Sequence, residues 1–581
     1  MAVTSVADQI VAVLRQAGVE RVYGVVGDSL NPVVDAIRRT DGISWVHVRN
    51  EEAGAFAAAA DAELTGRLAV CAGSCGPGNT HLLQGLYDAQ RSGLPVLALA
   101  SHIPSAQIGT GYFQETHPER VFTDCSGFCE MVGNPVQLPR LLRTAIQHAL
   151  GAHQVSVLVF PGDIAALPAA GPTGHSTFVP TGEQALAVPR DSQVRALAEL
   201  VNAAGKVTLF CGAGVRGAHS EVLRLAGTVQ APIGHSLRGK EWIQFDNPYD
   251  VGMSGLLGYG ACHEALHEAD LLVLLGTDFP YDSFLPQART VQVDHDATRL
   301  GRRTPLELAV HGDVGATLRA LQPLLKAKQD RSFLDGMLRK HYRNLEEVVG
   351  AYTRKIDHHL PIHPEYAASI LDQVAADDAV FTVDTGMNNV WAARYLTPNG
   401  RRRVIGSFLH GSMANALPHA IGAQFAAPGR QVVSLSGDGG LGMLLGELLT
   451  VAKYRLPVKT VVFNNGVLGM IKLEMMVSGY PESEIDNGDV DYAALAATLG
   501  MHSVRVTDPQ QVRAALTEAL AVPGPALVDL VTDPNALSMP PHITTAQLKG
   551  FALAAGRTVL SGGVGTMIDL ARSNLRNIPR P

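Results

Sequence analysis

The chain has 581 residues with a net charge of −8, and 46% of its residues are hydrophobic. This length exceeds what one hydrophobic core supports, so about three domains are expected. The negative charge, without any Lys/Arg-rich run, argues against general nucleic-acid binding, which needs a basic face. Since no run of about 18 apolar residues occurs and a helical pattern follows directly on the first residues, we expect neither a membrane span nor a secretory signal.

Strand and helix patterns alternate along three blocks. The first, residues 1–170, has apolar strands at 21–26, 68–72 and 96–100, and a Pro/Gly/Thr-rich linker follows at 165–183. The second, residues 186–335, has strands at 207–212, 271–276 and 290–294. The third, residues 355–535, follows a charged helical segment, and a separate tail covers 536–581. This alternation predicts an α/β protein with three doubly wound parallel-sheet domains.

The most specific motif lies in the third block. An apolar strand at 432–436 ends in Gly437-Asp438-Gly439-Gly440, and a second at 458–463 ends in Asn464-Asn465-Gly466. Ligands of parallel α/β sheets bind at the carboxyl ends of strands, and glycines let backbone N–H groups approach a phosphate. Because Asp438 and Asn465 offer oxygen ligands for a hard cation, the motif predicts Mg²⁺ bound together with a diphosphate.

Two further motifs lie in the first block. Glu51-Glu52 opens an Ala-rich helix at 53–64, a position where the helix dipole favours a carboxylate. Gly76-Pro77-Gly78-Asn79 forms a glycine-rich turn into the next helix. Taken alone, the glutamates could be ordinary N-terminal acids, and the turn could be structural rather than a ligand contact.

In this order along the chain, the three motifs resemble those of thiamine-diphosphate-dependent enzymes. Residues 27–32, 112–118, 237–241, 246–253, 391–396 and 410–416 are similar to segments of the pyruvate oxidase family, in particular its membrane-activated, quinone-reducing members. The resemblance covers essentially the whole chain. One departure is Met470, where relatives often have an aromatic residue beside the flavin.

The resemblance implies roles for individual residues. Glu51 would hydrogen-bond N1′ of the aminopyrimidine, the Gly411 carbonyl would accept from N4′, and Met413 would lie beneath the thiazolium. Phe113 and Gln114 would reach the active site across a subunit boundary, and Glu474 completes the catalytic set. Asp438, Asn465 and the Val467 carbonyl would bind Mg²⁺, and backbone at Gly386-Met387, Gly439-Gly440 and Gly469-Met470 would meet the diphosphate.

The middle block is expected to bind FAD. Asp294, at the end of a strand, is similar to the acidic ribose ligands of dinucleotide folds. The turns Gly252-Met253-Ser254-Gly255 and Gly276-Thr277-Asp278-Phe279-Pro280 would let backbone approach the flavin cofactor. The alternative is an unliganded α/β domain, as in simple decarboxylases.

An apolar stripe runs along the tail through Val564, Met567, Ile568, Ala571, Leu575 and Ile578. Arg572 and Arg576 lie off this stripe, a pattern that suits an anionic lipid surface. Docking on the protein's own surface is the alternative. By resemblance, we expect a cytoplasmic homo-oligomer, a dimer at least and a tetramer by family likeness, associated with the inner face of the cell membrane.

The function implied is oxidative decarboxylation of pyruvate to acetate and CO₂ through hydroxyethyl-thiamine diphosphate, with electrons passing through FAD to a membrane quinone. The alternative enzyme is an acetolactate-synthase-like carboligase in which FAD is structural. A regulator without activity would have lost Glu51, Asp438 or Asn465, and all three are present.

Overall fold

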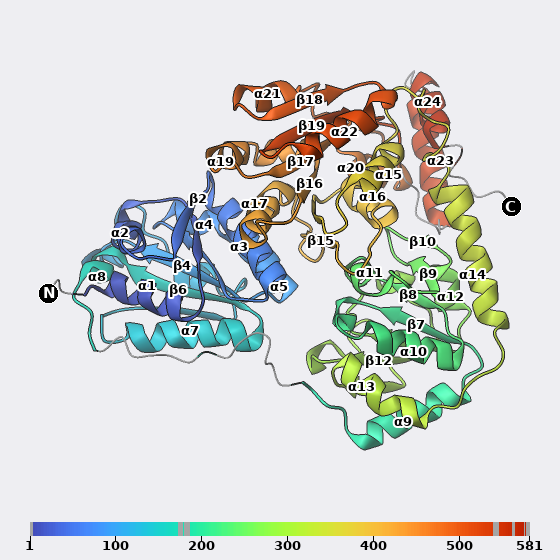
Figure 1. Ribbon diagram of the computed structural model, residues 1–581, viewed down its shortest axis with the longest axis horizontal. Coiled ribbons are helices and arrows are strands. Elements are labelled where there is room, and N and C mark those ends of the chain that lie inside the picture. The colour runs from blue at the N-terminus through green and yellow to red at the C-terminus, as the bar shows by residue number, and fades with distance from the viewer. Residues whose placement is uncertain are drawn as a thin grey trace.

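The computed structural model describes residues 4–171, 178, 186–537, 545–560, 564–574 and 576. Figure 1 shows three α/β domains, with the N-terminal domain in blue, the middle domain in green and the C-terminal domain in yellow to red. Most of the predicted linker lies outside the described residues. No described helix is long and apolar enough to cross a bilayer.

The N-terminal domain is built on a six-stranded parallel sheet of order β2-β1-β3-β4-β6-β5. Its strands are β1 Arg21–Gly24, β2 Ser44–His47, β3 Ala69–Gly73, β4 Val96–His102, β5 Phe128–Met131 and β6 Val155–Pro161. Its helices are α1 Val6–Gln16, α2 Asn31–Arg38, α3 Glu51–Thr65, α4 Pro77–His81, α5 Leu83–Ser92, α6 Pro118–Val121, α7 Leu138–Ala152 and α8 Gly162–Ala166.

The middle domain has a seven-stranded sheet of order β10-β9-β8-β7-β11-β12-β13. Its strands are β7 Val207–Cys211, β8 Ile233–His235, β9 Asp250–Met253, β10 Tyr259–Gly260, β11 Leu271–Leu275, β12 Arg289–Asp294 and β13 Leu308–His311. Its helices are α9 Asp191–Ala203, α10 His219–Val229, α11 Leu237–Ile243, α12 Cys262–His267 and α13 Val314–Leu321, and α14 Ser332–Asn344 leads onward. The predicted parallel pairing is confirmed except at β10, an edge strand antiparallel to β9.

The C-terminal domain has a six-stranded parallel sheet of order β15-β14-β16-β17-β19-β18. Its strands are β14 Val380–Val383, β15 Arg403–Gly406, β16 Val432–Gly437, β17 Val458–Asn464, β18 His502–Val506 and β19 Ala526–Val531. Its helices are α15 Pro364–Val374, α16 Met387–Tyr395, α17 Ala416–Ala426, α18 Asp438–Met443, α19 Glu447–Lys453, α20 Gly469–Val477, α21 Tyr492–Thr498 and α22 Val512–Ala521. Numbered within each domain, this strand order equals that of the N-terminal domain.

Helices α3 and α17 join the N- and C-terminal domains. A Cβ atom on Gly422 would lie 2.0 Å from the Ala57 carbonyl oxygen, so the two helix backbones approach closely. Six alanines of α3 belong to one continuous buried cluster with Leu417, Ala420, Ile421 and Ala423 of α17. The position of α3, which begins at Glu51, is therefore fixed by packing against both domains.

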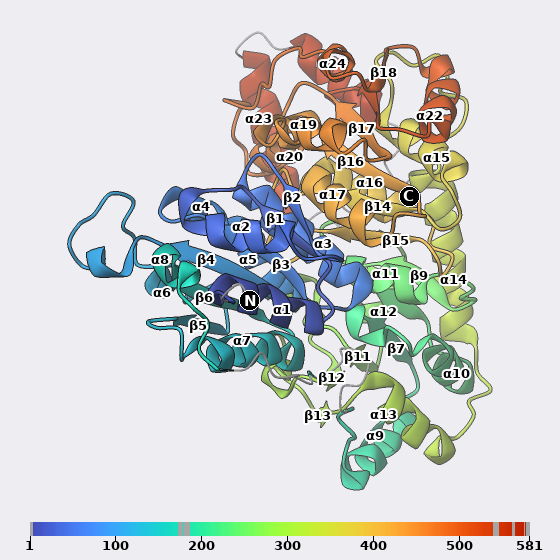
Figure 2. The same cartoon turned by 60° about the vertical axis from the view of Figure 1, so that its left-hand side comes forward.

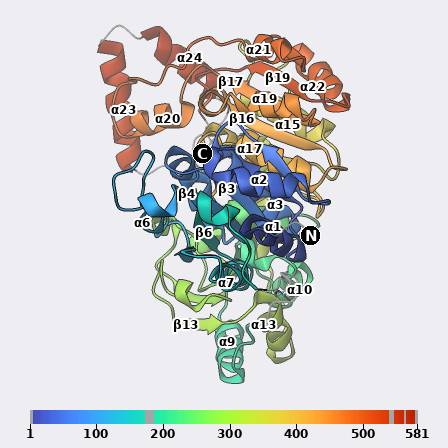
Figure 3. The ribbon, with the colours of Figure 1, turned by 90° about the vertical axis from the view of Figure 1, so that its left-hand side faces the viewer.

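The tail forms helices α23 Thr545–Leu560 and α24 Val564–Asn574, on the outside of the C-terminal domain (Figures 1 and 3). Leu570 is buried against Leu473 and Met476 of α20, and Ser573 donates to Asp533. Within the predicted stripe, Ile568 and Ala571 are exposed. Leu575, Ile578 and the side chains of Val564 and Met567 lie outside the described residues.

Candidate active site

A cavity of about 860 Å³ lies where the three domains meet. Loops at the carboxyl ends of strands in the middle and C-terminal domains line it, and Gln90 and Arg91 reach it from α5. Strand ends are where α/β sheets bind ligands, and this volume lies within the range of cofactor sites.

All ten residues predicted to hold thiamine diphosphate line this cavity: Gly386, Met387, Gly411, Met413, Asp438, Gly439, Gly440, Asn465, Gly469 and Met470. At Gly440 the space is filled, because a Cβ atom there would lie 1.9 Å from Oδ2 of the buried Asp384. A Cβ atom on Gly439 would lie 2.8 Å from the end of the Leu468 side chain. The bare backbone here leaves room for a phosphate group.

The predicted magnesium ligands lie together in the same cavity. Asp438 and Asn465 follow the neighbouring strands β16 and β17, and Val467 also lines the cavity. Oδ2 of Asp438 accepts from Nδ2 of Asn487 at 3.1 Å, and burial raises the pKa of this carboxyl. A divalent cation would offset the cost of burying that charge. A carboxylate, an amide oxygen and a carbonyl form a donor set that fits Mg²⁺.

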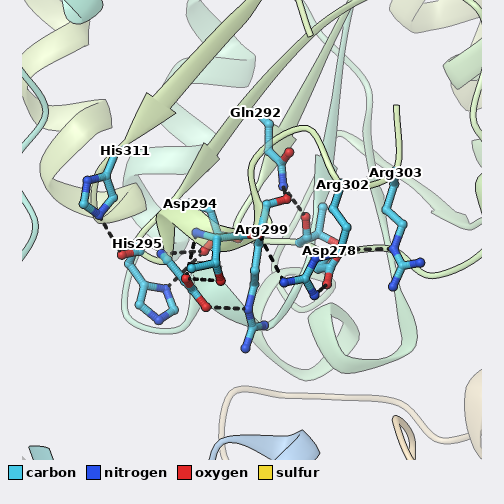
Figure 4. Close-up of polar contacts among 11 residues, drawn as sticks. Asp278, Gln292, Asp294, His295, Arg299, Arg302, Arg303 and His311 are labelled. Atoms are coloured by element: carbon cyan, nitrogen blue, oxygen red, sulfur yellow. Dashed lines mark hydrogen bonds and ion pairs between the residues drawn. The ribbon is translucent and has the colours of Figure 1, made fainter. Parts of the chain in front are cut away.

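The middle domain supplies the other side of the cavity. Met253, Ser254, Gly276, Thr277, Asp278, Phe279 and Pro280, all predicted to contact FAD, line it. Figure 4 shows Arg302 and Arg303 converging on Asp278, at 2.9 Å and 3.1 Å. Both arginines line the cavity and were missed in the sequence, although Arg299, Arg302 and Arg303 follow a strand end closely. Their charge suits the phosphates of a dinucleotide.

Three residues predicted for FAD are not among the described residues that line the cavity: Gly252, Gly255 and Asp294. Asp294 ends β12 and is buried, and its Oδ1 accepts the backbone N–H of Asp296 at 2.9 Å. Burial raises the pKa of Asp294. Figure 4 shows this carboxylate beside His295, and its role as a ribose ligand stays a prediction.

Glu51 belongs to a second polar cluster in the N-terminal domain. It begins α3, is buried, and its Oε2 lies 3.0 Å from Nδ1 of His81. A Cβ atom on Gly78 would lie 2.9 Å from Oε1 of Glu51, so the glycine-rich turn closes against this carboxylate. Close by, Cys75 donates its thiol to Oε1 of Gln114, whose φ is +62°. The sequence pattern does not indicate a role for His81, although this residue lies two positions after Asn79.

Glu51, Phe113 and Gln114 are not among the described residues that line the cavity, whereas Met413 and Glu474 do line it. Phe113 is 78% exposed on the segment between β4 and α6, which Figure 2 shows standing out from its domain. Within one chain, the predicted catalytic residues therefore form two groups. Met413 and Glu474 line the cavity, whereas Glu51, Phe113 and Gln114 lie in the N-terminal domain.

Both groups of predicted catalytic residues lie in segments that match known domains of thiamine-dependent enzymes. The chain matches the N-terminal TPP binding domain of thiamine pyrophosphate enzymes over residues 4–121, the central domain over 194–321 and the C-terminal TPP binding domain over 384–530. Thiamine pyrophosphate is another name for thiamine diphosphate, and these models support its binding.

Three relatives align along most of their length. A putative thiamine pyrophosphate-containing protein of Bacillus subtilis is 36% identical, over 93% of both chains. A pyruvate oxidase of Lactiplantibacillus plantarum is 30% identical over 90% of this chain and 87% of its own. The acetolactate synthase large subunit of Parasynechococcus marenigrum is 31% identical over 95% and 93%. The chain therefore belongs to the thiamine-diphosphate-dependent enzymes, in the family that includes pyruvate oxidases and acetolactate synthases.

Proposed function

We propose that this protein oxidatively decarboxylates pyruvate to acetate and CO₂, using thiamine diphosphate, Mg²⁺ and FAD, and passes the electrons to a membrane quinone. The observation that carries the proposal is one cavity lined by seven of the ten residues predicted for FAD and by all ten predicted for thiamine diphosphate. Electrons released at one cofactor would reach the other without crossing a layer of protein. The relative named as a pyruvate oxidase supports pyruvate as the substrate.

The residues of the site would bind the cofactors and the metal ion that this reaction requires. Thiamine diphosphate, when bound, supplies the electron sink for decarboxylation of a 2-oxo acid. The backbone at Gly439 and Gly440 would hold its diphosphate, and Asp438 and Asn465 would hold Mg²⁺. Met413 would support the thiazolium, and Glu51, which does not line the cavity within one chain, would hold the proton at N1′ of the aminopyrimidine. Arg302 and Arg303 would hold the FAD phosphates.

Two copies of the chain are proposed to complete each site, because Glu51 and Met413 lie in separate groups within one chain. The proposal predicts that co-expressed Glu51→Gln and Asp438→Asn chains form mixed dimers in which one site has both defects and the other has none. Activity of the purified mixed dimer well above either parent supports the shared site. Activity no higher than that of the parents contradicts it.

Carboligation to acetolactate is the second candidate, favoured by the relative named as an acetolactate synthase. Both reactions use the same cofactor contacts and begin with loss of CO₂ from pyruvate, so only the products separate them. Incubation with pyruvate and a soluble electron acceptor tests this directly. The oxidase forms acetate in proportion to reduced acceptor, whereas the carboligase forms acetolactate and leaves the acceptor oxidised.

The tail is proposed to dock on anionic phospholipid at the cytoplasmic face of the cell membrane. Helix α24 packs on the C-terminal domain through Leu570, Ser573 and Asn574, while Ile568 and Arg572 face outward. An exposed apolar residue beside a cation is the pattern that favours an interfacial helix.

A further inference from the structure

One face of α5 contacts the segment of the C-terminal domain that carries Gly411 and Met413. Gln84 Oε1 lies 3.0 Å from Nε2 of His410, and the Tyr87 ring stacks on the same imidazole at 5.4 Å. Asp88 Oδ2 lies 3.2 Å from Nε2 of His419, and Arg91 donates to the Leu409 carbonyl at 3.3 Å. The four α5 residues, here named the α5 clamp, have the i, i+3, i+4, i+7 spacing of one helix face.

A buried chain of hydrogen bonds leads from this clamp to the two loops that carry Gly411 and Gly386. Nδ1 of His419 lies 3.0 Å from Oδ1 of Asn415, and Nδ2 of Asn415 donates to Oδ1 of Asp384 at 3.2 Å. Asp88, His419, Asn415 and Asp384 are each at most 3% exposed. Asp384 precedes Thr385 and Gly386, which line the cavity, and Gly440 packs directly against its Oδ2.

The bonding pattern fixes how these groups are oriented. Nδ2 of Asn415 donates to Asp384 and to the Ser412 carbonyl, so Oδ1 is the acceptor, and it also receives the Ser407 backbone N–H. Nδ1 of His419 therefore donates to Oδ1 of Asn415. The remaining ring nitrogen, Nε2, faces Oδ2 of Asp88 at 3.2 Å, and this contact completes a continuous chain between the two domains.

The loop of residues 409–415 has a strained backbone at Ala414. Ala414 has a φ of +70°, a left-handed conformation that residues with a Cβ rarely adopt. Such a conformation persists only where the surroundings hold it. Nδ2 of Asn415 donates to the Ser412 carbonyl within the loop, which closes the turn that carries Met413, and to Oδ1 of Asp384 directly after β14, which anchors this turn to the sheet.

We propose that the α5 clamp and the buried Asp88–His419–Asn415–Asp384 chain set the conformation of residues 409–415, so that the Gly411 carbonyl and Met413 face the thiamine ring. This inference rests on the proposed function of Gly411 and Met413. Asp88 and His419 act through Asn415 and are positioning residues. The N-terminal domain thus orients residues 409–415 of its own chain through α5, independently of Glu51 on α3.

His419→Leu and the near-isosteric Asp88→Asn test the proposal in the full-length protein. Hydrogen–deuterium exchange over residues 407–415, measured without cofactor, should rise by about tenfold in His419→Leu and less in Asp88→Asn, because one link of the chain is lost or weakened. With thiamine diphosphate and Mg²⁺ added, kcat should fall by about tenfold while KM for pyruvate stays within about threefold, since the loop acts on the cofactor rather than on substrate binding.

His148→Leu is the matched control, because this histidine lies on α7 of the N-terminal domain and packs against Phe128. It should change neither exchange at 407–415 nor kcat. The double variant Asp88→Asn/His419→Leu should behave like His419→Leu alone, because both changes break the same chain.

Unchanged exchange at 407–415 in both Asp88→Asn and His419→Leu would overturn the clamp, whatever their activity. Calorimetric titration of the wild type with thiamine diphosphate and Mg²⁺ separates this result from failure of the proposed function. Absence of binding in the wild type would overturn the proposed function. The comparison of hydrogen–deuterium exchange between variants and wild type would still show whether the α5 clamp holds residues 409–415.

Discussion

Replacing Glu447 by Ala should loosen the contact between α19 and the segment that carries Glu51. Oε1 of Glu447 accepts the backbone N–H groups of Arg49 and Asn50 at 2.8 and 3.1 Å, and Oε2 accepts the Thr450 hydroxyl at 2.7 Å. Asn50 is the N-cap of α3, and its side chain accepts the Glu52 N–H. The buried carboxylate therefore fixes the start of the helix that places Glu51.

The magnitude follows from these three bonds. Hydrogen bonds to a charged group contribute about 1.5–3 kcal/mol each and are not additive, and each buried N–H group left without its acceptor costs about 1–3 kcal/mol. We expect Glu447→Ala to lower the thermal midpoint by about 5–10 °C. Glu447→Gln is the matched control, because its Oε1 can accept both N–H groups and its Nε2 can donate to Thr450. Burial raises the pKa of Glu447, so removal of the charge also removes a desolvation cost.

The assay is thermal unfolding followed by circular dichroism, together with turnover of pyruvate. Glu447→Gln should unfold within about 2 °C of the wild type and retain most of its turnover, whereas Glu447→Ala should lose both stability and turnover. Equal midpoints for the two variants would refute the reasoning, because the three hydrogen bonds would then contribute nothing.

Three further changes have defined outcomes. Glu51→Gln should lower turnover of pyruvate by about 10²–10⁴-fold, with thiamine diphosphate and Mg²⁺ binding largely intact, and near wild-type turnover would remove Glu51 from the catalytic set. Deletion of residues 560–581 should abolish stimulation by anionic vesicles but keep activity with a soluble acceptor, and unchanged vesicle binding would refute the tail model. Burial lowers the pKa of His341 from 6.5 to about 4. Between these two pH values the imidazole is protonated in the unfolded chain but neutral in the folded protein. The stability contributed by the neutral ring is therefore present above pH 6.5 and lost as pH falls towards 4. The thermal midpoint of His341→Gln should fall less steeply over this interval than that of the wild type, whereas a variant of the exposed His358 should follow the wild type.

Local sequence patterns predicted the strands and the cavity loops closely. The apolar runs at 432–436 and 458–463 became β16 and β17, and the polar residues that follow them line the cavity, because chain direction alone brings parallel strand ends to one edge. The glycines were recognisable because their bare backbone is required at close approaches, as at Gly440.

Contacts between domains were beyond prediction from local patterns. Asp88 meets His419, and Glu447 meets Asn50, only because α3, α5, α17 and α19 pack together across the domain boundary. Nothing in the residues around Asp88 indicates a partner so distant in sequence. His81 lies two residues after the Gly76–Asn79 turn and Arg302 eight residues after Asp294, so a search for polar residues near those motifs would have found them.

The visible absorption spectrum of the protein before and after anaerobic addition of pyruvate, with thiamine diphosphate, Mg²⁺ and FAD present, tests the central proposal most directly. Oxidation of pyruvate places two electrons on the flavin, so the account predicts that the yellow colour bleaches and returns when a quinone is added. Flavin that stays oxidised while acetolactate accumulates would contradict the oxidase and establish the carboligase.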